Sequence, residues 1–211
     1  MSLELANPLQ SNEKILDWQN TELTPLEESD LDLLYTWQNE PNIRDLTMGF
    51  RFPVQRETVK EWIRHQREQN AKSRIVFAIR QQYALVGTAQ LHSIDQYQRR
   101  ASLGIYIGDL KRRNNGLGFV SCSLIIDYAF NGLDFRKIGL EVVSINKNAI
   151  RLYEKLGFKK EGVRIEEYFL DGKYLDVYIY GLQKTDWKLD IPSTAHRLVG
   201  SNNLDDMRAG S

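Results

Sequence analysis

The segment 103–158 constrains this chain more than any other part of its sequence. It begins with the β-rich run 103–109, in which apolar residues alternate with a period of two. The three cations of Lys111–Arg113 come next, and Gly116 and Gly118 then open an apolar helix. A helix start presents unpaired N–H groups and a partial positive charge, and glycines let an anion approach the backbone closely. The segment therefore predicts a phosphate site between a strand and a helix.

Three known glycine patterns of ligand-binding loops could apply to this segment. A P-loop needs Gly-Lys-Ser/Thr at its end, but Gly118 is followed by Phe119-Val120. A dinucleotide fold needs Gly-x-Gly-x-x-Gly, which Gly116-x-Gly118-x-x-Ser121 matches only in part. The third pattern, Arg-x-x-Gly-x-Gly, is satisfied in full by Arg113, Gly116 and Gly118.

A second motif ends the segment: Asn146-x-x-Ala149-x-x-x-Tyr153-x-x-x-Gly157-Phe158. Asn146 can cap a helix, and Gly157 fits the left-handed position after its last turn. Together the two motifs resemble the GNAT superfamily of N-acetyltransferases, in particular the branch of spermidine, ribosomal-protein N-terminal and amino-sugar acetyltransferases. The likeness covers about residues 14–182. It implies transfer of an acetyl group from acetyl-CoA to a primary amine by direct attack, on a polyamine, an amino sugar or a protein N-terminus.

The order of elements predicts an α+β fold: strand, two helices, three strands, helix, strand, helix, two strands. The resemblance implies the GNAT fold, a mixed sheet of about seven strands flanked by about four helices, with two parallel strands splayed apart for the pantetheine arm. We expect an N-terminal arm at 1–13, the acetyltransferase domain at 14–184 and a C-terminal tail at 185–211.

Two local features of the first helical region are also predicted from the residues. Ser29, with Asp32 three residues later, is expected to cap the first helix. Pro41-Asn42 is expected to interrupt that helix and to begin an irregular segment that runs to Pro53.

The resemblance also implies where acetyl-CoA would bind. Strand residues would meet the pantetheine arm, N–H groups of the glycine loop would bind the phosphates, and the capping asparagine would bind the arm again. The expected contacts are Ile105, Ile107, Arg112, Arg113, Asn114, Asn115, Gly116, Leu117, Gly118 and Asn146.

Acetyl transfer needs a neutral amine and a proton for the leaving sulfur. An alkyl amine has a pKa of about 10.4, so a base or a water chain must remove its proton. Tyr153, which matches the tyrosine of the family's helix motif, is the predicted proton donor. Many relatives carry a glutamate on the strand before the loop, where this chain has Ser102, a poor base. His92, Glu141 and a water relay stay open as the base.

Acceptor specificity is expected in the region 37–52 and in the final hairpin. An acidic group there would suit a polyamine or an amino terminus. The candidates are Trp37, Glu40, Phe50 and Glu167. The residues alone do not select the amine.

Composition and the N-terminal sequence bear on the binding partners and the location of the protein. The 28 basic and 28 acidic residues give a formal net charge of zero, which provides no general attraction to nucleic acid or to an anionic membrane. Residues 1–6 lack the pattern of a signal peptide, and no apolar run reaches transmembrane length, so we expect a cytoplasmic protein. We expect no metal, and a homodimer stays open.

Two other function classes are kept as alternatives. A non-catalytic acyl-CoA-binding or interaction module would keep the fold and lack the base, as Ser102 would allow. A nicotinamide-dependent oxidoreductase rests only on the partial glycine match at Gly116 and Gly118.

Overall fold

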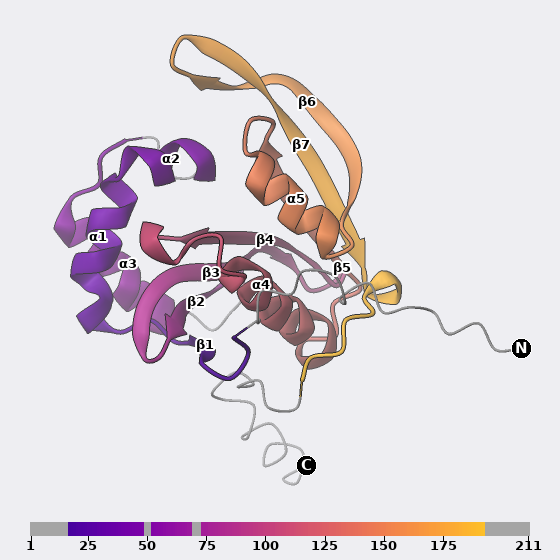
Figure 1. The fold of residues 1–211 in the computed structure, drawn as a ribbon, viewed down its shortest axis with the longest axis horizontal. Helices are drawn as coiled ribbons and strands as arrows, with labels where there is room; N and C mark the ends of the chain where they lie inside the picture. Colours follow the sequence, from indigo (N-terminus) through magenta and orange to yellow (C-terminus); the bar gives the residue numbers. More distant parts are fainter. Residues whose placement is uncertain (1–16, 49–51, 69–72, 193–211) are drawn as a thin grey trace, which may run out of the picture.

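A single mixed sheet organises the chain (Figure 1). The computed structural model describes residues 17–48, 52–68 and 73–192 of the 211. The seven strands lie in the order β1-β2-β3-β4-β5-β7-β6; only β4 and β5 pair in parallel. The strands are β1 (Thr21–Thr24), β2 (Arg74–Gln81), β3 (Ala84–Asp95), β4 (Arg100–Ile107), β5 (Lys137–Val143), β6 (Lys159–Leu170) and β7 (Lys173–Gln183). The predicted α+β class and the seven strands are confirmed.

Helices cover both faces of the sheet. They are α1 (Leu31–Asn39), α2 (Pro41–Thr47), α3 (Arg56–Glu68), α4 (Leu117–Asp127) and α5 (Lys147–Lys155). Alternation along β2 shows the two layers, because Val76 and Ala78 pack in the cluster with α1–α3, whereas Phe77 and Ile79 pack in the cluster with α4 and α5. No helix in the described ranges is long and apolar enough to cross a membrane.

The first helical region differs from the prediction at two points. Pro41 begins α2 instead of an irregular segment, because proline is well suited to the first position of a helix and Glu40 before it is extended. There are thus five α-helices in the described chain and not about four. The predicted Ser29 cap is also wrong: Asp30 precedes α1 and its carboxylate accepts from the Glu27 N–H at 2.9 Å, while the Ser29 hydroxyl donates to Glu27.

The parallel pair β4–β5 is short. Arg100, Ala101 and Ser102 pair with Lys137, Ile138 and Gly139, and the two strands then part. Each keeps its outer neighbour beyond that point, since β4 pairs with β3 as far as Ile107 and β5 pairs with β7 as far as Val143. The sheet therefore opens at its centre, as the resemblance implies.

The final hairpin extends beyond the rest of the fold (Figure 1). Asp171 and Gly172 both have positive φ, 48° and 78°, which suits the two-residue turn predicted at this place. The pairing register shifts between Arg164 and Tyr168, and within this bulge the Glu166 N–H donates to the Asp176 carboxylate at 3.0 Å. The strand β6 thus forms an exposed, kinked edge of the sheet.

The first part of the predicted tail packs on the domain. Trp187, Leu189 and Ile191 contact the apolar cluster under α4 and α5, and the Trp187 ring lies 6.3 Å from Phe130. The predicted arm at 1–13 lies outside the described residues, so the domain limits stay a prediction.

A buried ion pair joins the helical layer to the sheet, and we expect its loss to destabilise the fold. Arg80 of β2 donates to both carboxylate oxygens of Asp30, at 3.1 and 2.9 Å, and both side chains are largely buried. The substitution Asp30→Ala should lower the free energy of unfolding by about 3 kcal/mol, because it leaves the largely buried guanidinium with only the exposed carboxylate of Glu27, 3.9 Å away, as an ionic partner. Urea denaturation measures this change.

Asp32→Ala is the matched control. Asp32 pairs with Arg56 on the surface, so its removal should leave the denaturation midpoint almost unchanged. Equal effects of the two substitutions would contradict the assigned role of the buried pair.

Candidate active site

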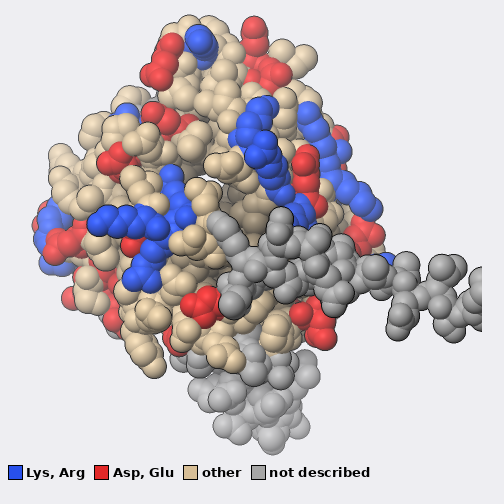
Figure 2. All heavy atoms as spheres, viewed as in Figure 1, with Lys and Arg blue, Asp and Glu red and all other residues tan. Residues whose placement is uncertain are grey.

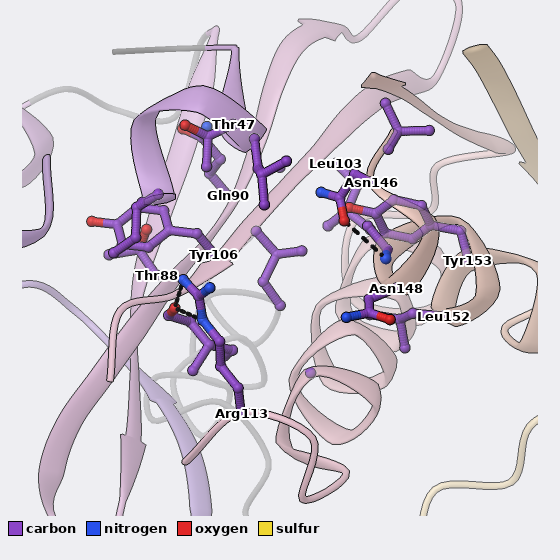
Figure 3. Close-up of a pocket in the computed structure, with 18 of the residues that line it drawn as sticks. Thr47, Thr88, Gln90, Leu103, Tyr106, Arg113, Asn146, Asn148, Leu152 and Tyr153 are labelled. Atoms are coloured by element: carbon purple, nitrogen blue, oxygen red, sulfur yellow. Dashed lines mark hydrogen bonds between the residues drawn. The ribbon is translucent and has the colours of Figure 1, made fainter. Parts of the chain in front are cut away.

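A cavity of about 510 Å³ lies where β4 and β5 part. Its wall includes residues of α2, the β4 segment Leu103–Ile107, the glycine loop and α5 (Figure 3). On the molecular surface, Lys and Arg side chains gather on both sides of a central hollow, over the glycine loop and over α5 (Figure 2). The hollow thus has the charge that phosphate groups require.

The glycine loop has the backbone shape of an anion cradle. A short 3₁₀ turn, Leu110–Arg112, leads to Asn114 and Gly116, whose φ values are 63° and 82°. The helix α4 begins directly after Gly116, so its first amides have no partner in a preceding turn. The loop residues therefore fit a pyrophosphate, with the helix dipole adding to the local positive charge.

The side chains of two loop arginines are already engaged. Arg113 donates from Nε and Nη2 to the carbonyl of Ile107, at 2.9 and 2.8 Å (Figure 3). Burial lowers the pKa of the Arg113 guanidinium, and the nearby Glu40 opposes this shift. Arg112 donates from Nη1 to Gln81 at 2.9 Å. These arginines tie the loop to the sheet, so the backbone of the loop would supply most phosphate contacts.

The α5 residues complete the side of the cavity opposite the loop. Asn146 Oδ1 accepts from the Ala149 N–H at 3.2 Å, which confirms the helix cap. The ring of Tyr153 extends from α5 toward Asn146 and Leu103 (Figure 3). Burial raises the pKa of the Tyr153 hydroxyl, and the neighbouring thiol of Cys122 adds to the shift. Tyr153 is therefore a neutral phenol that can donate a proton.

A polar row crosses the sheet on the face toward α2 and α3. Arg74, His92 and Ser102 occupy register-matched positions on β2, β3 and β4. Burial lowers the pKa of His92, Arg74 lowers it further, and Glu141 acts in the opposite direction. His92 and Ser102 adjoin the cavity without forming its wall, whereas Arg74 belongs to it.

Glu141 is the one carboxylate in the wall among the residues that the structure describes. Arg164 of β6 holds it with two contacts, Nη2 to Oε1 at 2.8 Å and Nη1 to Oε2 at 3.1 Å. The sequence places Glu141 on a strand but does not give the register that brings it, with Gln90, into the cavity. The one signal in the sequence was that Glu141 and Gln90 are polar residues within largely apolar strands.

The predicted acceptor residues are dispersed. Trp37 is buried in the core, and its ring packs so tightly on Gly108 that an added Cβ would lie 2.0 Å from it. Glu40 and Glu167 do not line the cavity. Glu167 Oε1 lies 3.7 Å from Nη1 of Arg164. Phe50 lies outside the described residues.

The opened parallel pair, the glycine cradle and the tyrosine on the facing helix define an acyl-CoA-dependent transferase. A family model of the GNAT acetyltransferase domain matches residues 20–159, and the chain belongs to this family. The chain is thus an N-acetyltransferase, which acetylates amines with acetyl-CoA as the donor. The family match gives no support to the alternative of a non-catalytic acyl-CoA-binding module.

Individual relatives agree with this assignment. A spermidine N(1)-acetyltransferase of Vibrio cholerae is 32% identical over 161 residues, which cover 75% of this chain and 91% of the relative. A putative ribosomal N-acetyltransferase, YdaF of Bacillus subtilis, is 28% identical over 50% of this chain and 57% of its own length. The structure of a Vibrio cholerae spermidine N-acetyltransferase in complex with CoA and spermine has a TM-score of 0.72, with 27% identity over 79% of this chain and 97% of that one.

Proposed function

We propose that this enzyme acetylates a small primary amine in the opening between β4 and β5. The observation that carries the proposal is the position of this opening, which has the cradle of the glycine loop at one end and the polar row of Arg74, His92 and Ser102 at the other. Bound acetyl-CoA would supply the acetyl group as a thioester. The predicted contacts, which are Ile105, Ile107, residues 112–118 and Asn146, would hold it.

The protein's own groups would handle the protons. Tyr153 would donate to the leaving sulfur, because its hydroxyl is buried, neutral and at the inner wall of the cavity. His92 would take the proton of the amine through a water, and Ser102 in the same row would hold that water. Burial keeps His92 uncharged at neutral pH, which a base requires.

The remaining assignments concern the domain and the acceptor. We propose that residues 14–184 form the catalytic domain and that Glu167 acts at the acceptor entrance through Arg164. Glu40 lies near Arg113 of the glycine loop and keeps its predicted acceptor role as a proposal. Trp37 would act only by supporting β4 from the core. Phe50 stays a predicted residue of acceptor specificity.

Replacement of Tyr153 by Phe should separate chemistry from binding. The substitution removes only the donor hydroxyl, so we expect kcat to fall by about 10²-fold while the Kd of acetyl-CoA stays within twofold. Steady-state kinetics and isothermal titration measure the two quantities. Because burial raises the pKa of Tyr153 above its ordinary value, the wild-type kcat should not decline between pH 8 and 9.5.

Tyr180→Phe is the matched control for this substitution. Tyr180 is also buried, but its hydroxyl donates to Glu154 at 3.0 Å, away from the cavity wall. It should keep wild-type turnover. An unchanged kcat in Tyr153→Phe would remove the role of proton donor.

The base can be assigned by comparing His92→Gln with Glu141→Gln. Because the pKa of His92 is lowered from 6.5, wild-type kcat should be flat near pH 7 and fall only as the pH drops through that lowered value. His92→Gln should reduce kcat at pH 7 by at least tenfold and recover toward pH 9, where more amine is already neutral. A large loss in Glu141→Gln alone would transfer the role to Glu141, and two small losses would indicate a water relay.

We also propose a homodimer that forms through the final hairpin. The edge strand β6 exposes Val163, Ile165 and Phe169, the start of β7 exposes Tyr174, and a related spermidine N-acetyltransferase was solved in a dodecameric form. Ile165→Asp should then convert a dimer to a monomer in light scattering. Tyr97→Asp, at an equally exposed aromatic residue in the β3–β4 turn, should leave the mass unchanged, and a wild-type monomer would contradict the proposal.

A further inference from the structure

The charges in the cavity wall do not suit a polycationic acceptor. The described residues of the wall include three cations, Arg74, Arg112 and Arg113, and one carboxylate, Glu141. Arg112 and Arg113 belong to the glycine loop at the phosphate end. The acceptor end therefore contains Arg74 and Glu141.

Glu141 is already neutralised. Its two oxygens each lie within 3.1 Å of a nitrogen of Arg164, which forms a forked pair. An ammonium group brought to this carboxylate would have to compete with a guanidinium in a better geometry. A polyamine would bring additional ammonium groups toward Arg74, where like charges repel.

Arg74 is the cation at this end of the cavity. It is the first residue of β2, its side chain is exposed, and no ion pair to it occurs within the described part of the chain. Arg74 and Trp62 also line a shallow cavity of about 610 Å³ beside α3, so both stand where the two cavities meet. Glu61 and His65 also line this second cavity, but no ion pair between Glu61 and Arg74 occurs among the described residues.

The distance from Arg74 to the opening fits a small acceptor. Arg74 and Ser102 are in register two strands apart, which places their Cα atoms about 10 Å from each other. Arg74 and Glu141 both belong to the cavity wall, so the arginine side chain reaches the same cavity as the opening. A carboxylate bound to its guanidinium would leave an amine only a few bonds away near the point where β4 and β5 part.

Apolar side chains line the same end. Ile43, Leu46 and Met48 belong to or follow α2, and Trp62 projects from α3. An acceptor with an aliphatic side chain would cover these residues, and its burial would add to the affinity.

From these features we propose that the acceptor is an amino acid with an apolar side chain, whose carboxylate is bound by Arg74 while its amine is acetylated. The inference rests on the proposed function and specifies its substrate class. Arginine binds carboxylates through two parallel N–H···O bonds, which orients the acceptor as well as holding it. Arg74 would be a specificity-determining residue of this enzyme.

Matched acceptors test the carboxylate. The probes are L-leucine, L-leucinamide, isoamylamine, the dipeptide leucylglycine and spermidine, each with saturating acetyl-CoA. We expect L-leucine to exceed the other four at least tenfold in kcat/KM. Isothermal titration of L-leucine into protein saturated with CoA gives a second readout that does not depend on turnover, and it should show binding.

Variants test the residue. Arg74→Met should raise the KM for L-leucine about 10- to 100-fold, abolish its binding in the titration and leave the Kd of acetyl-CoA unchanged. Because Arg74 lowers the pKa of His92, the rates with L-leucine and isoamylamine are compared at pH 9, where His92 is uncharged in both proteins, and the loss with isoamylamine should be at least tenfold smaller than the loss with L-leucine. Arg74→Lys should retain part of the preference. Lys60→Met, which removes an exposed cation of α3 that lines neither cavity, should behave as the wild type.

Several results would overturn the inference. Spermidine, isoamylamine or leucylglycine used as well as L-leucine would do so, as would an equal effect of Arg74→Met on all acceptors. If no amine is acetylated, the proposed function fails, and the titration with L-leucine still decides whether Arg74 binds a carboxylate.

Discussion

The short parallel pairing of β4 with β5, three residues in each strand, determines where the sheet can bind a ligand. β4 and β5 are parallel partners only from Arg100 to Ser102, and past that point each is held by its outer neighbour alone. Beyond that point the facing N–H and C=O groups of β4 and β5 do not hydrogen-bond to each other. Leaving them unpaired costs free energy unless a ligand or water binds them. The cavity, the placement of the cradle at one end and the polar row at the other all follow from this early separation.

The helices make the opening asymmetric. α4 and α5 lie on one face, with Gly118 of α4 close enough to Leu152 of α5 that an added Cβ would lie 3.4 Å away. α1, α2 and α3 lie on the other face, where Trp37 presses on Gly108 at the end of β4. One face thus contributes the proposed phosphate cradle and the proposed proton donor, and the other contributes the proposed acceptor end.

The sequence predicted the features that short motifs determine. The cap by Asn146, the left-handed Gly157 and the Asp171-Gly172 turn each need a particular residue type at one position, and all three are present. It did not predict α2, because a proline can either interrupt a helix or occupy its first position. It could not place Arg74 and Glu141 in one cavity, since that depends on the pairing register across the four strands from β2 to β5, which a local sequence pattern does not contain.

The two bonds from Arg113 to the Ile107 carbonyl have a thermodynamic meaning for the cradle. A side chain that fastens the loop to the end of its own strand, with Arg112 fastened to Gln81, fixes the loop within the folded protein. The conformational entropy of ordering the loop is then lost during folding and not on association. The proposed cradle is thus preorganised, and the free energy of phosphate binding there would not be reduced by a folding step in the loop.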